Sequence, residues 1–133
     1  MTGTGADEVL IAVLRGDEFL VLLRSPFKKG YWHLAGGGVE EGETDADAAA
    51  RELYEETELA ASTLEDLGAD LGYDGVSVHA FATEAPPAWE PTLNEEHDDH
   101  RWCSLGDALE LVRYEEPREV LRRAGALFGV GGA

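Results

Sequence analysis

The chain has 133 residues, a hydrophobic content of 44%, and 28 acidic against 10 basic side chains, which gives a formal net charge of −18. This length and composition predict one globular domain over residues 1–133, and the charge argues against a nucleic-acid partner, which would need a basic surface. No apolar run is long enough to span a membrane, Cys103 is the only cysteine, and the start, MTGTGADE, lacks the features of a signal peptide, so we expect a cytoplasmic protein without disulfides or membrane contacts.

The chain begins with two apolar runs that are typical of a β-hairpin. Residues 8–15 and 18–24 are the predicted strands, and Gly16-Asp17 supplies the turn. Arg24 ends the second strand, and the loop over residues 25–30 contains the only two lysines, Lys28 and Lys29. In so acidic a chain these cations are candidates for binding an anion, although a solvated turn explains them equally well. A short strand over residues 31–34 follows and leads into a glycine-rich loop.

A helical pattern begins after these glycines. Thr44 is a typical N-cap, and Asp45 and Asp47 place negative charge in the first turn, where the helix dipole favours it. The helix is predicted to run to about residue 57. We expect the face that packs against the rest of the protein to consist of small and apolar residues at three- and four-residue steps, which are Ala46, Ala49, Ala50, Leu53 and Thr57.

The other side of this helix carries a cluster of carboxylates. Glu52 precedes Glu55 and Glu56 by three and four residues, so the three side chains share one patch. Like charges at these spacings destabilise an isolated helix by roughly 0.2–0.5 kcal/mol per pair. Arg51 can pair with Glu55 but cannot balance the whole set. Oxygen ligands without a full counter-charge suit a hard divalent cation, and this predicts a Mg²⁺ site, with Mn²⁺ as an alternative.

The stretch from Gly37 to Leu59 resembles the Nudix box, G-x5-E-x7-R-E-U-x-E-E-x-G-U, in which U is a bulky apolar residue. The glycine before the last apolar position is Glu58 here, a departure that bears on the turn after the helix rather than on the metal ligands. A solvated acidic helix would explain the charge, but not the glycines or the register. The residues that fall on the pattern are Gly37, Glu43, Arg51, Glu52, Leu53, Glu55, Glu56 and Leu59.

The resemblance implies an α/β fold, namely the Nudix-type α/β/α sandwich with a mixed β-sheet between helices. It also implies hydrolysis of a diphosphate linkage, in which bound metal polarises the diphosphate and activates water. The implied metal ligands are Glu52, Glu55, Glu56 and the Gly36 carbonyl. Arg51 is expected to orient the glutamates, and Glu43 and Leu53 to support the box. The candidate substrate-binding residues are Arg24, Lys28, Lys29, Gly37 and Gly38.

The second half of the chain is predicted to contain strands over residues 63–69 and 76–83, with His79 as a cross-strand residue, then a short strand and helices over 105–112 and 117–128. Residues 95–100 contain two histidines and four carboxylates. They are interpreted as a separate metal site, as a polar loop, or as the source of a carboxylate that reaches the box. Glu96 is the first choice for that carboxylate and Glu95 the second, so the general base is either Glu52 or Glu96.

The order of residues in this half is similar to that of small bacterial Nudix members that act on nucleoside or pterin triphosphates. The expected activity is therefore hydrolysis of a (deoxy)nucleoside triphosphate to a monophosphate and pyrophosphate. The alternatives are a dinucleoside polyphosphate hydrolase, a catalytically silent nucleotide-binding module on the same fold, and a structural protein that binds divalent ions. A homodimer through the sheet edges or the last helix is left open.

Overall fold

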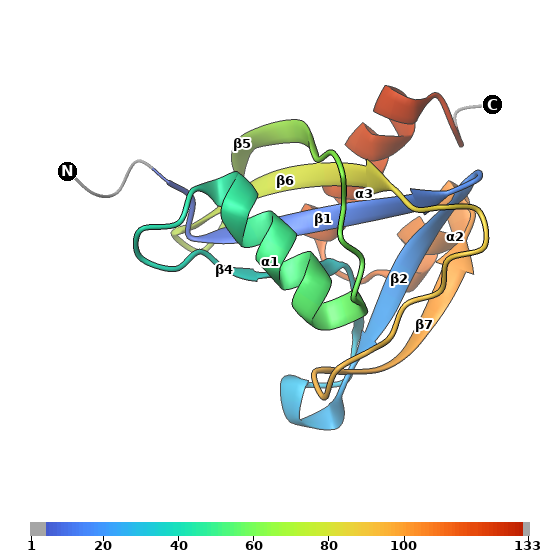
Figure 1. Ribbon diagram of the computed structural model, residues 1–133, viewed down its shortest axis with the longest axis horizontal. Coiled ribbons are helices and arrows are strands. Elements are labelled where there is room, and N and C mark those ends of the chain that lie inside the picture. Colours follow the sequence, from blue (N-terminus) through green and yellow to red (C-terminus); the bar gives the residue numbers. More distant parts are fainter. Residues whose placement is uncertain (1–4, 132–133) are drawn as a thin grey trace.

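The computed structural model describes residues 5–131, so the ends of the predicted domain, residues 1–4 and 132–133, lie outside the described part. A mixed β-sheet lies between one helix on one face and two helices on the other (Figure 1). The predicted α/β/α sandwich is confirmed. In chain order the elements are β1 (Glu8–Arg15), β2 (Glu18–Arg24), the 3-10 helix η1 (Pro26–Lys28), β3 (Trp32–His33), β4 (Ala35–Gly38), α1 (Asp45–Thr57), β5 (Glu65–Tyr73), β6 (Val76–Glu84), β7 (His97–Cys103), α2 (Leu105–Leu111) and α3 (Glu115–Phe128).

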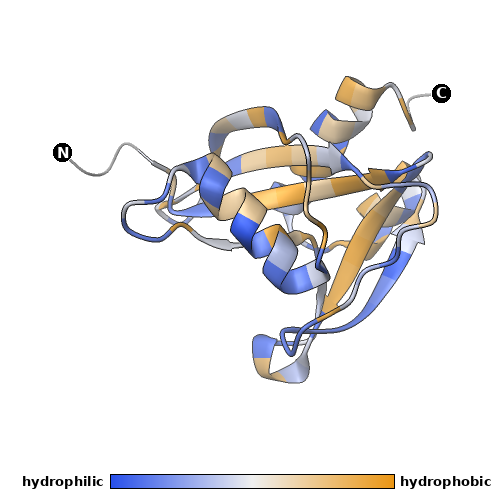
Figure 2. Cartoon of the chain, in the orientation of Figure 1, coloured by the Kyte–Doolittle hydropathy of each residue, from blue (hydrophilic) through white to orange (hydrophobic). Residues whose placement is uncertain are grey.

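The central strand of the sheet is β1. It pairs in parallel with β6, and on its other edge it pairs antiparallel with β4 along its first half and with β2 at its end. Leu10, Ala12 and Leu14 enter the core beneath α2 and α3, whereas the alternate residues enter the core beneath α1. Because both faces are covered, the strand is apolar along its length (Figure 2).

The predicted hairpin of residues 8–15 and 18–24 is confirmed as β1 and β2. The glycine-rich segment differs from the expected loop, because Gly36, Gly37 and Gly38 belong to strand β4. A side chain at Gly36 would collide with the backbone of β1, and one at Gly37 would collide with the Glu52 carboxylate. The glycines therefore allow α1 to lie close against this strand.

Helix α1 has the predicted cap, since the Thr44 side chain accepts a hydrogen bond of 3.0 Å from the Asp47 N–H. The predicted packing face is partly wrong. Ala46 and Ala50 are exposed, and Ala48 is buried instead. The reason is that the helix is rotated so that two glutamates also face the sheet. The buried residues are Ala48, Ala49, Glu52, Leu53, Glu56 and Thr57.

In the second half, β5 extends beyond the predicted range, to Tyr73, and α3 begins two residues before Pro117. His79 is more than a cross-strand residue: its Nδ1 lies 2.7 Å from Asp45 Oδ2, and its Nε2 lies 2.9 Å from Asp66 Oδ1. Burial opposes protonation, but the two carboxylates outweigh it and raise the pKa of His79. This contact joins the start of α1 to β5 and β6.

No helix within residues 5–131 combines the length and the apolar character needed to cross a membrane.

Candidate active site

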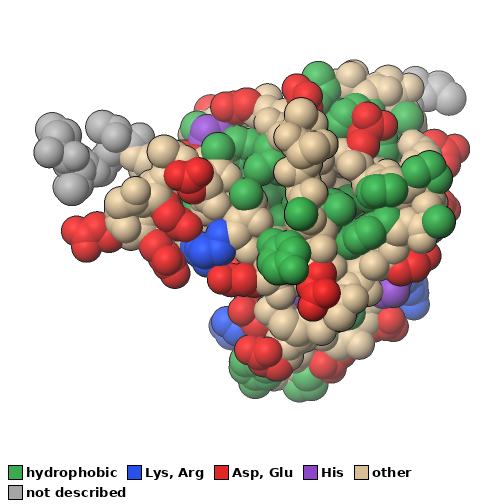
Figure 3. Space-filling view, viewed as in Figure 1, with side chains coloured by type: hydrophobic (Ala, Val, Ile, Leu, Met, Phe, Trp, Pro, Cys, Tyr) green, Lys and Arg blue, Asp and Glu red, His purple; other side chains and the backbone are tan. Residues whose placement is uncertain are grey.

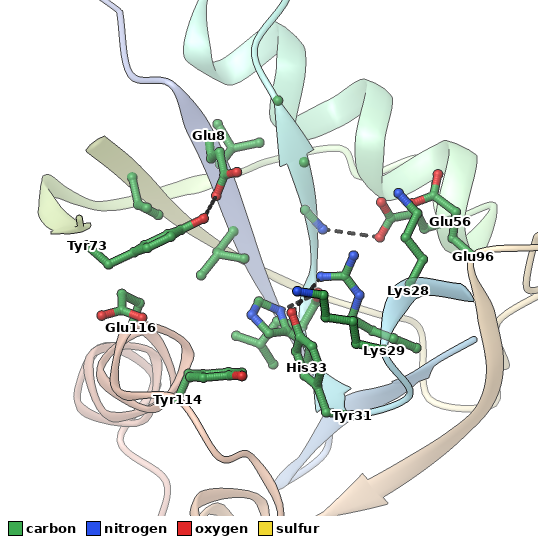
Figure 4. Close-up of a pocket in the computed structure, with 18 of the residues that line it drawn as sticks. Glu8, Lys28, Lys29, Tyr31, His33, Glu56, Tyr73, Glu96, Tyr114 and Glu116 are labelled. Carbon is green, nitrogen blue, oxygen red and sulfur yellow. Dashed lines mark hydrogen bonds and ion pairs between the residues drawn. The ribbon is translucent and has the colours of Figure 1, made fainter. Parts of the chain in front are cut away.

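A cavity of about 730 Å³ opens beside the first half of β1 and β4. The loop after β2, the start of β7 and the start of α3 form its other walls (Figure 4). It brings together segments that are far apart in the sequence. The residues of the sequence-predicted site that line it are Arg24, Lys28, Lys29, Gly36, Gly37, Gly38, Glu56 and Glu96.

A buried pair of glutamates lies at one end of this cavity. Glu56 is 1% exposed, and its Oε1 accepts a hydrogen bond of 3.1 Å from the Gly36 N–H. Burial raises the pKa of Glu56 far above its ordinary value, and the nearby Glu52 and Glu96 carboxylates add to the rise. Burial also raises the pKa of Glu52, against the opposing charge of Arg51. Two such carboxylates cannot both be ionised at low cost without a cation beside them.

The donor set at this pair fits a hard divalent cation, because carboxylate and carbonyl oxygens are its preferred ligands. In residues 5–131, however, no three Asp, Glu, His or Cys side chains are arranged as a metal cluster. Glu55, the third predicted ligand, is exposed, and its Oε1 accepts a hydrogen bond of 3.3 Å from Arg51 Nη1. The fold thus brings Glu52 and Glu56 together but directs Glu55 to the arginine.

Arg51 holds the junction between β4 and α1. Its Nε donates to Glu43 Oε2 at 2.7 Å, and its Nη2 donates to the Gly38 carbonyl at 3.0 Å. The guanidinium also lies 3.4 Å from Glu52 Oε2. Arg51 does not line the cavity, and Leu53, on the buried face of α1, does not line it either. Both residues therefore occupy supporting positions.

The basic residues reach the same end of the cavity from β2 and the following loop. Arg24 Nη1 donates to the Tyr31 hydroxyl at 3.0 Å, and its guanidinium lies 5.1 Å from the centre of that ring. Lys28 Nζ lies 3.8 Å from Glu96 Oε1. Lys29 has a positive φ of 76° and also lines the cavity. The three predicted cations therefore line the same cavity as Glu56, and Lys28 lies beside Glu96.

The segment before β7 is fixed to the loop after β2. The Ser25 hydroxyl donates to the Glu95 carbonyl at 2.6 Å, and the Ser25 N–H donates to the Glu96 carbonyl at 2.9 Å. Glu96 lines the cavity, whereas the Glu95 side chain is exposed and is absent from the lining. Of the two predicted carboxylates, the first choice is therefore the one that lies at the site.

His97 is one of the two histidines of the candidate metal site over residues 95–100, but the described residues form no such cluster. His97 is 7% exposed, and its Nδ1 lies 4.0 Å from Glu56 Oε1. Among the described residues this Nδ1 is the one buried side-chain polar atom without a hydrogen-bond partner. Burial lowers the pKa of His97 to about 4, and nearby positive charge adds to this effect, so the ring is neutral at pH 7. Burial likewise lowers the pKa of His33 to about 4.

Several other residues reach the cavity from separate elements. No motif connects them, because they come from β1, the segment around β3, β5 and the start of α3. His33, at the end of β3, belongs with them. Those that the sequence did not indicate as site residues include Glu8, Tyr31, Tyr114 and Glu116, and Tyr73 joins them as a tyrosine downstream of the box.

Comparison with known families identifies the fold. The family model described as NUDIX domain matches residues 6–124. The chain belongs to the Nudix hydrolase family. Members of this family act on small nucleotide substrates and generally use divalent metal ions, so the box register and the buried glutamates are features of a pyrophosphohydrolase scaffold.

Three relatives illustrate the range of proteins that this chain is similar to. A Myxococcus xanthus protein named octanoyltransferase is 39% identical over 129 residues, which cover 89% of this chain but only 36% of that protein. CTP pyrophosphohydrolase from Escherichia coli is 31% identical over 107 residues, covering 77% of this chain and 79% of the relative. The structure of a Caenorhabditis elegans Ap4A hydrolase in a binary complex is similar with a TM-score of 0.79 and 27% identity, over 92% of this chain and 98% of the other.

Proposed function

We propose that this Nudix hydrolase converts a (deoxy)nucleoside triphosphate to the monophosphate and pyrophosphate, with Mg²⁺ or Mn²⁺ as cofactor. The observation that carries the proposal is the pairing of two kinds of group at one end of the cavity. Glu56 and Glu96 offer carboxylate oxygens and Arg24, Lys28 and Lys29 offer positive charge in the same cavity, while Glu52 lies behind its lining, against Gly37. A polyphosphate chain requires both, because its charge must be neutralised as the leaving group departs.

In this proposal the metal is held by Glu52, Glu56 and the Gly36 carbonyl, with Glu55 joining them by leaving Arg51. When bound, the cation neutralises phosphate charge and lowers the pKa of the attacking water. The protein supplies the rest: Arg51 keeps Glu52 in place, and Gly37 and Gly38 let the substrate approach the backbone. A rotation of Glu55 costs little, because its contact with Arg51 is exposed.

The attacking water must lose a proton to a base of the chain as its oxygen bonds to phosphorus and pyrophosphate leaves. Glu52 and Glu96 are the two candidates. Glu96 is about one-third exposed, lines the cavity and lies 3.8 Å from Lys28 Nζ. Glu52 belongs to the buried pair, and its raised pKa makes it a stronger base once ionised. Comparing the activities of Glu52→Gln and Glu96→Gln separates the two assignments.

The similarity to E. coli CTP pyrophosphohydrolase supports a nucleoside triphosphate as substrate. The similarity to a C. elegans Ap4A hydrolase supports a second candidate, a dinucleoside polyphosphate hydrolase. The two activities differ in their products, since only the first releases a monophosphate and pyrophosphate from a single nucleotide. The presence of all three box glutamates supports a hydrolase over a silent binding module.

The test is a hydrolysis panel in Mg²⁺ and Mn²⁺ with products resolved by chromatography. It includes nucleoside triphosphates, dinucleoside polyphosphates, ADP-ribose and NADH. We expect monophosphate and pyrophosphate from at least one triphosphate. In Glu56→Gln we expect kcat to fall about 100-fold or more, because a carboxylate proposed to hold the metal ion is lost. Glu41→Gln removes the same charge from an exposed position of the box loop and should keep full activity.

Release of two unequal nucleotides from a dinucleoside polyphosphate, with no turnover of triphosphates, would favour the second candidate. Absence of turnover of every compound by the folded, metal-loaded protein would overturn the proposal.

A further inference from the structure

The cavity that contains Glu56 has a second end of different chemistry. In Figure 4 Glu56, Glu96 and Lys28 lie at one end, and Glu8, Tyr73, Tyr114 and Glu116 lie at the other. The first end combines carboxylates with cations. The second combines aromatic rings with carboxylates, and all of its residues come from elements outside the Nudix box.

The second end offers exposed aromatic surface. Tyr73 and Tyr114 are 42% and 43% exposed, and they are two of the few large hydrophobic side chains within residues 5–131 that face solvent. Tyr114 packs edge to face against Tyr31, with ring centres 5.1 Å apart and an angle of 78° between the planes. Rings that remain exposed inside a cavity suit a flat apolar ligand, which can stack on them without displacing packed side chains.

The polar side chains that line the cavity around these rings are mainly hydrogen-bond acceptors, and the Arg113 guanidinium lies 5.5 Å from the centre of the Tyr114 ring without lining the cavity. The Tyr73 hydroxyl donates to Glu8 Oε1 at 3.0 Å, which leaves Glu8 Oε2 available to a ligand. Desolvation and Glu8 raise the pKa of Tyr73, and Tyr31 and Glu116 contribute further, so these groups converge on one region. The cations that line the cavity come instead from the end of β2 and the loop after it. The tyrosine end is thus rich in acceptors and negatively charged.

We propose that this tyrosine end is a nucleobase subsite that selects bases carrying an exocyclic amino group, a proposal that rests on the proposed triphosphate hydrolysis. The base stacks on Tyr114, and the carboxylates of Glu8 and Glu116 accept hydrogen bonds from its amino edge. Cytosine and adenine present such donors, whereas uracil, thymine and hypoxanthine present a carbonyl oxygen at the corresponding position. A carbonyl facing these carboxylates would lose the hydrogen bond and be repelled.

The charge distribution also fixes the direction of the substrate. Phosphates are attracted to Arg24, Lys28 and Lys29 and repelled by Glu8 and Glu116. The base therefore enters the tyrosine end while the phosphates reach the glutamates of the box. This arrangement explains how a chain with a net charge of −18 can bind a polyanion in one orientation.

The test compares substrates that differ only in the amino group. We expect kcat/KM for CTP to exceed that for UTP by about tenfold, and kcat/KM for ATP to exceed that for ITP similarly, since one such hydrogen bond discriminates by about this factor. In Glu116→Gln the ratios should fall to about twofold, because an amide can donate to a carbonyl. Glu110→Gln, which removes an exposed charge outside this cavity, should keep the wild-type ratios.

A binding measurement separates failure of this proposal from failure of the proposed activity. Calorimetry with the α,β-methylene analogues of CTP and UTP reports base preference without turnover. Tighter binding of the CTP analogue, lost in Glu116→Gln, supports the subsite even if no triphosphate is hydrolysed. Equal binding of both analogues, or hydrolysis of both triphosphates at the same kcat/KM, overturns it. Tyr114→Leu should weaken both analogues about tenfold, whereas Tyr114→Phe should not; unchanged binding in Tyr114→Leu would exclude stacking on that ring.

Discussion

At the scale of single residues, His97 is unusual because it is buried and one of its polar atoms has no partner. Its Nδ1 lies next to the buried Glu56, and its ring is neutral. An unsatisfied polar atom costs free energy, roughly 1–3 kcal/mol, so a packing role alone would be better filled by an apolar side chain. Such an atom at the end of the cavity is therefore best explained by the site rather than by the core.

We predict that His97→Leu leaves the stability unchanged or raises it by about 1 kcal/mol while lowering kcat about tenfold or more. Leucine removes the unsatisfied nitrogen and has a similar size, but it leaves nothing to contact Glu56 or the substrate. Denaturant unfolding and steady-state kinetics on the same preparations check this. His97→Asn, which keeps a polar nitrogen near the position of Nδ1, should recover part of the activity. A large loss of stability in His97→Leu with unchanged kcat would show that the residue is structural.

At the scale of elements, the end of α1 shows how the fold accommodates the departure from the Nudix box. Glu58 occupies the C-cap with a positive φ of 64°, and its N–H donates to the Tyr54 carbonyl at 2.8 Å. The turn therefore keeps the left-handed geometry that the family glycine would favour. Because Glu58 has a Cβ, its left-handed backbone conformation is strained. The box glutamates on the preceding turn keep their positions.

We predict that Glu58→Gly raises the free energy of unfolding by about 0.5–1 kcal/mol. Glycine removes the strain of the positive φ, and this gain exceeds its greater loss of backbone entropy on folding. Urea unfolding followed by far-UV circular dichroism is a suitable measurement. Glu58→Ala serves as the control, because alanine keeps the Cβ and should not stabilise the protein. If both variants were equally stabilised, removal of the charge, and not relief of strain, would be the cause.

At the scale of the whole molecule, negative charge dominates. Carboxylates are scattered over the face shown in Figure 3, with few cations among them. Most of the described cations are already paired with carboxylates, as Arg51, Arg122 and Arg123 show. The excess charge repels itself in the folded state and repels an anionic substrate at long range. The cluster of Arg24, Lys28 and Lys29 is a local exception within this field.

We predict that added salt stabilises the protein and lowers KM for a triphosphate at constant Mg²⁺. Raising ionic strength from about 0.01 M to about 0.15 M shortens the screening length from about 30 Å to about 8 Å, which weakens the repulsion between distant carboxylates. A gain of about 1 kcal/mol would raise Tm by a few degrees in a chain of this size. Thermal unfolding in NaCl and in choline chloride measures the effect and separates screening from specific binding of Na⁺. A Tm that falls with salt would contradict the prediction.

The sequence by itself determined the family, the fold class and the positions of most main elements. The hairpin, the cap at Thr44 and the spacing of Glu52, Glu55 and Glu56 depend on neighbouring residues and on the periods of strand and helix, so they can be predicted without the rest of the chain. The length of β5 and the strand at the glycines were not predicted, because pairing with β6 and β1 extends them.

Only the tertiary structure decided which of the predicted groups share an environment. The sequence treats Glu52, Glu55 and Glu56 alike, yet packing against β4 buries two of them and raises their pKa values, while Glu55 stays in solvent. The tertiary structure also brings Tyr31, Tyr73 and Tyr114 to one cavity from three distant segments. Burial and contacts between distant segments arise only when the whole sheet is assembled, and these properties set the charge state and the shape of the site.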